Sequence, residues 1–208
     1  MKDIKYPRTP HLPWSEGKTD DDKTLDNVLH FDNLSLVWTI KMDGENTTMT
    51  RDKVYARSVD SVDHPSRHWV KALWSSIAYK ISPNLRICGE NLFAKHSIEY
   101  ENLGSYFYVF NMWIGDKCLP WDKTVDLCED FGFKHVGVLA NNLSSDAFPN
   151  VHTLFLDGYA KTQEGYVVRN RGGFNYADFS KNVAKYVRAN HVQTDSHWMF
   201  QTITKNGL

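Results

Sequence analysis

The sequence predicts an α+β protein built of antiparallel sheets with flanking helices. Many short runs of β-branched and aromatic residues are interrupted by only two or three helical patterns, and the helices do not alternate strictly with the strands. This order is typical of α+β folds and not of doubly wound sheets. Neither a GxxxxGK[ST] phosphate loop nor a GxGxxG fingerprint is present, so P-loop and Rossmann nucleotide binding lack their usual sequence support.

The composition sets limits on the class of protein. The 208 residues are 41% hydrophobic and 13% aromatic, which supplies one well-filled core or two small ones. A formal net charge of −1 argues against a general nucleic-acid coat protein, although a local basic groove stays open. The three cysteines form no CxxC pair, so we expect reduced core residues and neither a zinc site nor a disulfide framework. No apolar stretch resembles a secretory signal or a membrane span.

The first elements follow from local patterns. Residues 1–24 hold three of the seven prolines and show no periodicity, so residues 1–30 are expected to form an arm that packs on the body through Trp14. The β-branched and aromatic run 34–41 predicts a buried strand. Residues 49–58 predict two short strands around an Asp-Lys turn.

A helix is predicted over residues 66–80, with Ser66 as its N-cap and Pro83 beyond its end. Helical spacing places Trp69, Leu73 and Ile77 on one face, together with Lys80. The remaining elements are expected in this order: strands 85–93 and 106–114, a helix over 121–132 capped by Gly132, a strand over 136–140, a loop around Pro149, a strand over 164–170 and a basic segment over 179–192.

The stretch WTIKMDGENTT, residues 38–48, places Lys41 at the end of an apolar run with carboxylates close by. Lys41 is either a solvated strand end or a nucleophile, and Gly44 permits a tight turn and close approach of a ligand. A lysine amine attacks only when deprotonated, which burial or neighbouring cations favour. Asp43 and Glu45 would oppose deprotonation, so a bound nucleotide and metal would have to reverse the local electrostatics.

Four later motifs allow both a structural and a chemical interpretation. Glu90 in CGEN is either an exposed strand end or a carboxylate for a ribose hydroxyl or a metal. Phe110 in YVFNMW is either core or a stacking surface for a purine. Glu164 in EGYVVR either flanks a turn or offers a hard oxygen ligand for Mg²⁺. Lys185 and Arg188 in KYVR form either a solvated face or a phosphate clamp.

Taken in order, the five motifs resemble those of the covalent nucleotidyltransferase superfamily, which comprises ATP-dependent RNA and DNA ligases and mRNA capping enzymes. That superfamily carries K-x-D-G, a glutamate strand, an aromatic strand, E-G-x-V-hydrophobic-K/R and a basic motif, on which fall Lys41, Glu90, Phe110, Glu164 and Lys185. The resemblance covers residues 36–190. It implies one nucleotidyltransferase (ATP-grasp-like) domain over 1–208, with no separate C-terminal domain.

The residue five positions after the lysine points to one branch of the superfamily. Capping enzymes and DNA ligases usually place an arginine there, whereas this chain has Asn46 and so is similar to the RNA ligase 2-type branch. Two positions depart from the pattern. Asn111 replaces the usual aspartate after the aromatic residue, so any charge role there is lost. The basic motif is commonly K-x-K, but here Arg188 follows Lys185 after two uncharged residues, which leaves the second cation of the clamp open.

The resemblance implies a mechanism with three transfer steps that use ATP and Mg²⁺ or Mn²⁺. Lys41 would attack the α-phosphate of ATP, AMP would pass to an RNA 5′-phosphate, and a 3′-hydroxyl would seal the strand. Catalytic roles fall on Lys41, Glu90, Glu164 and Lys185, and Glu164 and Glu90 would also hold the metal. Nucleotide contacts are implied for Ile40, Lys41, Asn46, Arg57, Glu90 (ribose), Phe110 (adenine), Glu164, Lys185 and Arg188.

The expected partners are RNA ends, on a nicked duplex, a single strand or an RNA–DNA hybrid, and the expected role is RNA repair. RNA contacts would come from the domain surface, from the arm or from a partner protein. We expect a monomer in the cytoplasm of a bacterial or phage-infected cell, with no membrane contact. Three alternatives remain: a DNA-nick ligase, a capping-type guanylyltransferase, and a non-catalytic relative that binds nucleotide or RNA.

Overall fold

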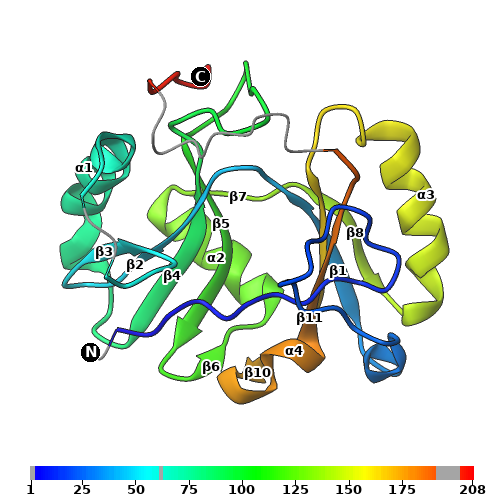
Figure 1. Cartoon of the computed structure of the whole chain (residues 1–208). Helices are drawn as coiled ribbons and strands as arrows, with labels where there is room; N and C mark the ends of the chain where they lie inside the picture. Colours follow the sequence, from blue (N-terminus) through cyan, green and yellow to red (C-terminus); the bar gives the residue numbers. More distant parts are fainter. Residues whose placement is uncertain (1–2, 61–62, 191–201) are drawn as a thin grey trace.

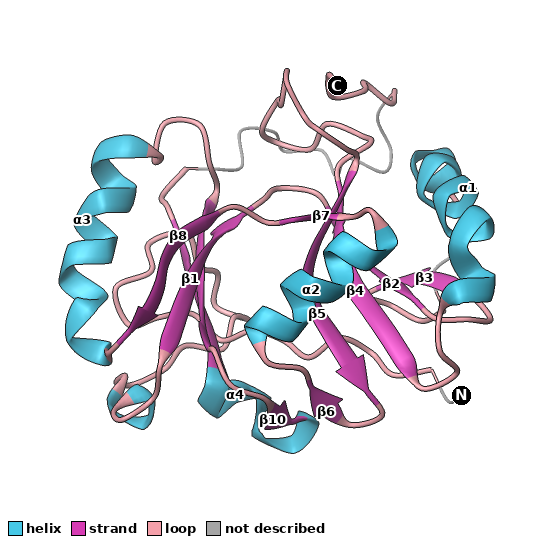
Figure 2. Ribbon diagram, turned by 180° about the vertical axis from the view of Figure 1, so that it is seen from behind, coloured by secondary structure: helices cyan, strands magenta, loops and turns pink. Residues whose placement is uncertain are grey.

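Two sheets lie side by side, and each has one helix on its outer side (Figures 1 and 2). The computed structural model describes residues 3–60, 63–190 and 202–208. Within these residues, every neighbouring pair of strands is antiparallel except one, in which β5 and β7 run parallel. The predicted α+β class with antiparallel sheets is therefore confirmed.

The smaller sheet has four strands in the order β11-β9-β1-β8. Their bounds are Leu36–Lys41 (β1), Val138–Leu143 (β8), Gly165–Asn170 (β9) and Val183–Val187 (β11). Helix α3, Phe148–Gly158, lies along this sheet at the right edge of Figure 1. Its buried face packs Phe148 and Phe155 against Trp38 and Tyr166 of the strands. Burial of such aromatic side chains is a major stabilising contribution to the core.

The larger sheet has the order β10-β6-β5-β4-β2-β3, with β7 attached to β5. Its strands are Glu45–Met49 (β2), Val54–Ala56 (β3), Leu85–Asn91 (β4), Phe107–Ile114 (β5), Lys117–Cys118 (β6), Lys134–His135 (β7) and Phe174–Asn175 (β10). Helices α1, His68–Ile77, and α2, Trp121–Phe131, bury Val70, Ile77 and Cys128 against it. A second apolar cluster therefore stabilises this sheet.

The K-x-D-G motif connects the two sheets. Lys41 is the last residue of β1 in the smaller sheet, and Glu45 is the first residue of β2 in the larger one. Three residues, Met42–Gly44, therefore cross from one sheet to the other. This crossing places the lysine between the sheets rather than at an outer edge.

Several predicted elements agree with the structure and others need correction. Gly132 caps α2 with φ 72°, as predicted. The loop expected around Pro149 is wrong, because Pro149 lies in the first turn of α3, where its missing N–H costs no hydrogen bond. Ser66 is not the N-cap of the 66–80 element: the side chain of His64 accepts the N–H of Ser66 and caps a short 3-10 turn before α1.

Three further boundaries differ from the predictions. The first strand predicted in 49–58 begins earlier, at Glu45. The basic segment 179–192 divides into a short helix α4, Phe179–Asn182, and strand β11; its residues 191–192 lie outside the described residues. No helix in the described part of the chain is long and apolar enough to cross a lipid bilayer.

The N-terminal arm packs on the smaller sheet, as predicted. The backbone N–H of Leu12 donates to the carbonyl of Lys185 at 2.8 Å, and the N–H of Lys185 donates to Pro10 at 2.9 Å. The indole N–H of Trp14 donates to the hydroxyl of Tyr166 at 2.9 Å. The arm, dark blue in Figure 1, therefore runs beside β11 along the side of the sheet that faces the viewer.

Residues 202–208, which we call the C-terminal strip, pack on the loop that follows β4. Asn206 is buried, and its side chain accepts the N–H of Tyr100 at 2.9 Å and donates to the carbonyl of Leu92 at 2.8 Å. The hydroxyl of Tyr106 donates to the carbonyl of Asn206 at 2.9 Å. The side chain and backbone of this one residue thus tie together the start, middle and end of the 92–106 loop.

Candidate active site

A cavity of about 270 Å³ lies between the two sheets and the arm. Its walls come from β1, β2, β4, β5, β9 and β11 and from arm residues 6–9 and 22. Seven of the nine residues predicted to contact nucleotide line it: Ile40, Lys41, Asn46, Arg57, Glu90, Phe110 and Lys185. The fold therefore brings together residues that are up to 145 positions apart.

Lys41 reaches the cavity from the end of β1. Its Nζ lies 2.5 Å from Oε2 of Glu164, and the two side chains are 24% and 8% exposed. Burial acts to lower the pKa of Lys41, but the carboxylates of Glu164, Glu90 and Asp43 outweigh it and raise this pKa above its usual value. The amine is therefore held as an ammonium ion in the free protein.

Gly165 explains why a glycine follows Glu164. It opens β9 opposite Lys41, and a Cβ added there would lie 1.9 Å from the carbonyl oxygen of Tyr186. Only a residue without a side chain allows β11 to approach so closely. This close packing fixes the carboxylate of Glu164 beside the amine.

The carboxylates near Lys41 in sequence have separate partners in the structure. Asp43 binds the 97–98 backbone: its Oδ2 accepts the N–H groups of Ser97 and Ile98 at 2.7 and 2.8 Å. Glu45 forms a two-point ion pair with Arg67, with Nε donating at 2.8 Å. The two carboxylates next to Lys41 in the sequence therefore have structural roles. Asp43 anchors the loop, and Glu45 holds Arg67, which directly precedes α1.

Gly44 allows the loop to pass close to β4. A Cβ at this position would lie 2.6 Å from the carbonyl oxygen of Asn91 and 2.7 Å from the side chain of Leu92. The N–H of Gly44 donates to Oε1 of Glu90 at 3.2 Å. The close approach that the structure shows at Gly44 is therefore to Asn91 and Leu92, and the approach of a ligand there stays a prediction.

Glu90 reaches the same cavity from β4. Burial, with the negative charges of Glu164 and Asp43, raises its pKa to about 8, while Lys41 and the Gly44 N–H act in the opposite direction. Glu90 therefore takes up a proton at higher pH than an exposed glutamate does. Asn46 lies opposite Glu90 on β2, and its Oδ1 is buried without a hydrogen-bond partner among the described residues. Both groups are placed to exchange hydrogen bonds with a polar ligand.

Phe110 lines the cavity from β5 and touches the edge of the Tyr6 ring, with centroids 5.2 Å apart. The next residue, Asn111, is buried and donates to the hydroxyl of Tyr6. Its Oδ1 accepts from the buried guanidinium of Arg169, which also donates to the carbonyl of Leu119 at 2.8 Å. The amide at this position therefore holds Arg169 with a neutral acceptor where the superfamily pattern has a carboxylate.

The two cations of the basic motif have different surroundings. Lys185 lines the cavity, and its Nζ lies 3.8 Å from Oδ1 of Asp22. Burial, then the positive charge of Lys41, lowers the pKa of Lys185 against the opposing effect of Asp22. Arg188 does not line the cavity; its Nε donates to the carbonyl of Gln163 at 2.9 Å. Lys185 therefore lies at the cavity, whereas Arg188 lies outside its lining and contacts the backbone of Gln163 and Glu164.

Sequence reasoning missed the contribution of the arm. Tyr6, Arg8 and Asp22 line the cavity, yet no local motif marks them. They arrive there because the backbone of the arm pairs with β11. The acidic residues 20–22 stand out in the sequence, but nothing in the sequence indicates which residues they contact.

A metal would need ligands beyond these side chains. In residues 3–60, 63–190 and 202–208, no group of three His, Cys, Asp or Glu side chains converges to hold an ion. Glu90 and Glu164 are close enough to affect each other's charge. Hard carboxylate oxygens suit Mg²⁺ or Mn²⁺, and such ions commonly take the rest of their ligands from water and substrate phosphates. The donor set therefore fits a divalent ion that arrives with a nucleotide.

A family model described as RNA ligase matches residues 34–187. The chain belongs to the RNA ligase family. This match covers the five ordered motifs and confirms the resemblance seen in the sequence. No curated protein matches the chain in sequence.

Solved structures agree with this fold. An archaeal ATP-dependent RNA ligase aligns with a TM-score of 0.56 and 15% identity, over 88% of this chain and 48% of its own. An Aquifex aeolicus protein provisionally described as an ATP-dependent DNA ligase aligns with a TM-score of 0.53 and 20% identity, over 77% of this chain and 46% of its own. A Naegleria gruberi RNA ligase mutant solved with ATP and Mn aligns at 0.49 and 16% identity, over 88% and 60%. The first two show a shared fold, and this chain spans about half their length.

Proposed function

We propose that this chain is the catalytic domain of an ATP-dependent RNA ligase that joins 3′-hydroxyl and 5′-phosphate RNA ends through a covalent lysyl-AMP intermediate. The observation that carries the proposal is the position of the Lys41 amine. It lies in a cavity between two sheets, 2.5 Å from Glu164 and in the same cavity as Glu90, Phe110 and Lys185. Membership of the RNA ligase family supports the assignment.

In the first step, Nζ of Lys41 attacks the α-phosphorus of ATP. The bond from that phosphorus to the oxygen that bridges to the β-phosphate breaks, pyrophosphate leaves, and the amine loses its proton. Phe110 offers a flat wall for adenine, since it lines the cavity from β5. Lys185 offers a cation for the phosphate oxygens, on the side of β9 opposite to Lys41.

Lys41 must be deprotonated before it attacks, and its acidic neighbours oppose this. A divalent ion, held by Glu164 and Glu90 with the phosphates, would supply positive charge that cancels these carboxylates. Asn46 and Glu90 are placed to orient the nucleotide, because the Asn46 Oδ1 has no protein partner among the described residues and Glu90 lies opposite it. Arg188 supports the site indirectly, through the backbone that leads to Glu164.

In the later steps, AMP passes from Lys41 to the 5′-phosphate of an RNA end, and a 3′-hydroxyl then displaces AMP to form the phosphodiester. RNA repair is the cellular role that we propose. The substrate form, whether nicked duplex, RNA–DNA hybrid or single strand, follows from a sealing assay on the three substrates in parallel.

The decisive experiment mixes the protein with α-labelled ATP or GTP and a divalent metal, followed by denaturation. We expect label from ATP on the protein, stable to denaturant and released by acid, as for a phosphoramidate. Label from GTP alone would indicate a capping-type guanylyltransferase, and no label from either would leave a non-catalytic nucleotide- or RNA-binding relative. Sealing of nicked DNA in preference to RNA would favour a DNA ligase instead.

A further inference from the structure

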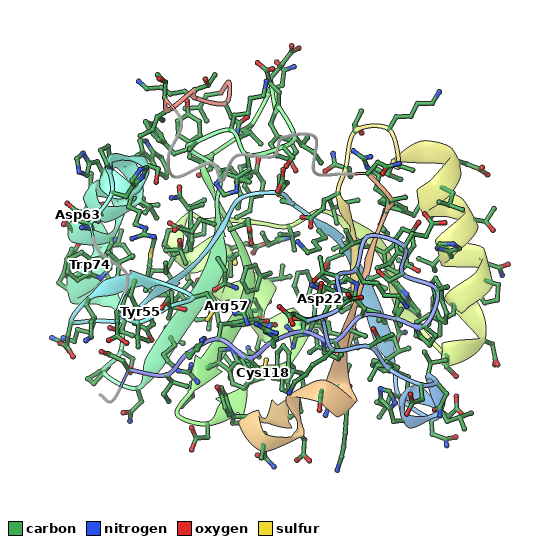
Figure 3. All side chains as sticks on the ribbon, in the orientation of Figure 1. Asp22, Tyr55, Arg57, Asp63, Trp74 and Cys118 are labelled. Carbon is green, nitrogen blue, oxygen red and sulfur yellow. The ribbon has the colours of Figure 1, made fainter. Side chains whose placement is uncertain are left out.

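The N-terminal arm adds charged side chains to the cavity that none of the five motifs contains. Arg8 and Asp22 line it together with Arg57, which follows β3 on the larger sheet. Figure 3 shows Asp22 and Arg57 in the central part of the molecule, between the two helical flanks. The backbone bonds between Pro10 and Lys185 hold this part of the arm in place. Arg8 is therefore presented to the cavity by a fixed backbone.

Arg57 has an unused hydrogen-bonding group at the cavity. Its backbone N–H donates to the carbonyl of Asn46 at 2.9 Å, which fixes its position beside β2. Its side-chain Nε is buried and has no partner among the described residues. Burial, and then the positive charge of Arg8, lowers the pKa of Arg57, so the two guanidinium groups lie close enough to repel each other. A buried unpaired donor is costly to retain without a ligand.

Asp22, the carboxylate that the arm contributes to the cavity, forms its ion pairs and hydrogen bonds with residues other than Arg8 and Arg57. Asp22 lies 3.8 Å from Lys185 and 3.5 Å from His11, and its Oδ2 accepts from the backbone and hydroxyl of Thr19. Arg8 donates to the carbonyl of Asp21 at 2.9 Å, and within the described residues neither Arg8 nor Arg57 has an ion pair. Asp22 lies near enough to act on the charge of Arg57 but forms no ion pair with it among the described residues. Two neighbouring guanidinium groups that make no ion pair suit a tetrahedral anion.

We propose that Arg8 and Arg57 form a second phosphate subsite, in which the arm contributes directly to substrate binding. The ligand is a phosphate group carried either by ATP, as its β- and γ-phosphates, or by RNA, as its 5′-terminal phosphate. This inference rests on the proposed function, because Lys185 and Lys41 define where the α-phosphate would lie. Asp22 serves as the resident counterion of Lys185 until phosphate arrives.

Arg8→Ala tests the subsite, with Lys5→Ala as a matched control on the same exposed arm. Three measurements are made on the full chain: binding of inorganic pyrophosphate by calorimetry, the KM for ATP in adduct formation, and the rate of AMP transfer to a 5′-phosphorylated RNA by the adenylylated protein. Loss of one charged hydrogen bond weakens binding by about tenfold or more. Trp14 fluorescence checks that the arm stays docked on Tyr166.

If the ligand is the tail of ATP, Arg8→Ala raises the KM for ATP and weakens pyrophosphate binding, while AMP binding stays unchanged. If the ligand is the RNA end, adduct formation stays normal and AMP transfer slows. Arg8→Lys should restore only part of either effect, because an ammonium cannot form the two-point contact of a guanidinium. In the double variant with Arg57→Ala, the two losses should be less than additive if both groups hold one anion.

Two results would overturn the subsite: Arg8→Ala within twofold of wild type in all three measurements, or an equal loss in Lys5→Ala. These results are distinct from failure of the proposed function, which is absence of label on the wild-type chain. Pyrophosphate binding needs no catalysis, so it tests the subsite even in that case. Equal pyrophosphate binding in wild type and Arg8→Ala would then exclude the tail of ATP as the ligand, and equal binding of a 5′-phosphorylated RNA would exclude the RNA end.

Discussion

Lys41 and Lys185 lie in one cavity, on the two strands that flank β9, yet their surroundings have opposite charge. Lys41 faces the carboxylates of Glu164, Glu90 and Asp43, which raise its pKa against the effect of burial. Burial is the largest cause that lowers the pKa of Lys185; the positive charges of Lys41 and Arg57 act in the same direction, and Asp22 and Glu164 oppose them. The protein therefore shifts the pKa values of the two lysines in opposite directions.

This difference is the reverse of what adduct formation needs. A nucleophile has to lose its proton, whereas a phosphate-binding lysine has to keep one. Polyphosphate beside Lys185 would stabilise its ammonium form, and positive charge beside Glu164 would release the proton of Lys41. In the proposed reaction, the substrate would therefore complete the electrostatics of this site, and Lys41 would stay an ammonium ion until the substrate binds.

The largest effect is expected for Lys41→Ala, which removes the proposed nucleophile. Adduct formation should fall below detection, because no other side chain can form the bond to the α-phosphorus. Lys185→Ala should still form adduct, about 10²-fold more slowly, since it removes one stabilising charge, and Lys185→Arg should recover part of the rate. Quantified label on denaturing gels checks all three. A labelled Lys41→Ala protein would remove Lys41 from its role.

Glu164→Gln is expected to have a large effect on the proton affinity of Lys41. Without this carboxylate, the pKa of Lys41 should fall, because Glu164 is the largest of the influences that raise it. Lys41 would then react with an amine-specific reagent at lower pH, which mass spectrometry of the modified peptide can follow across a pH series. Glu99→Gln, which breaks only the surface pair with Lys95, serves as the control. An unchanged midpoint would show that Glu164 does not control the charge of Lys41.

A moderate effect is expected on the pH dependence of stability. The pKa of Glu90 is raised from 4.5 to about 8 on folding, so between these pH values the folded state binds more protons than the unfolded state. The contribution of Glu90 to the free energy of unfolding therefore decreases as pH rises from about 5 to 8. Glu90→Gln should flatten this dependence in urea titrations at pH 5, 6.5 and 8. Exposed Glu101 gives the control variant, Glu101→Gln, whose profile should match wild type.

The smallest effect on the difference between the two lysines is expected for Asn206→Ala. Asn206 holds the loop whose Ser97 and Ile98 N–H groups bind Asp43, next to the nucleophile. The variant removes two side-chain hydrogen bonds, from the N–H of Tyr100 and to the carbonyl of Leu92. They contribute about 1 kcal/mol each, so the melting temperature should fall by several degrees. Loosening Asp43 should also move the Lys41 reactivity profile to lower pH. Lys205→Ala, beside it in the strip, should do neither.

Local patterns predicted the elements with strong periodicity, the motif residues and the packing of the arm through Trp14. They did not predict the contacts of the arm with the cavity or those of the strip. Gly132 and the strand before Lys41 follow from short-range chemistry. Helix α3 was missed because Pro149 suggested a loop, although proline is well tolerated in a first helical turn. Arg8 reaches the cavity only through backbone pairing with β11, and such pairing leaves no side-chain pattern in the sequence.

The candidate site residues fall into two groups: those that line the cavity and those that do not. Ile40, Asn46 and Glu90 were named from motifs and line the cavity. Arg188 was named from the same kind of pattern but packs against the carbonyl of Gln163. Spacing alone could not distinguish it from Lys185, because the twist and pairing of β11 decide which cation faces inward. The roles of all these residues stay predictions until the variants are measured.

The C-terminal strip has a practical consequence, because its contacts are those of a docked peptide. Asn206 and Gly207 bond to Leu92, Tyr100 and Leu103 through a single short stretch of chain. A protein that ends at residue 201 should therefore accept a synthetic peptide of residues 202–208 by complementation. The peptide concentration would then set the fraction of the protein in which the loop that binds Asp43 is held in place. The pKa of Lys41 could therefore be adjusted by adding peptide.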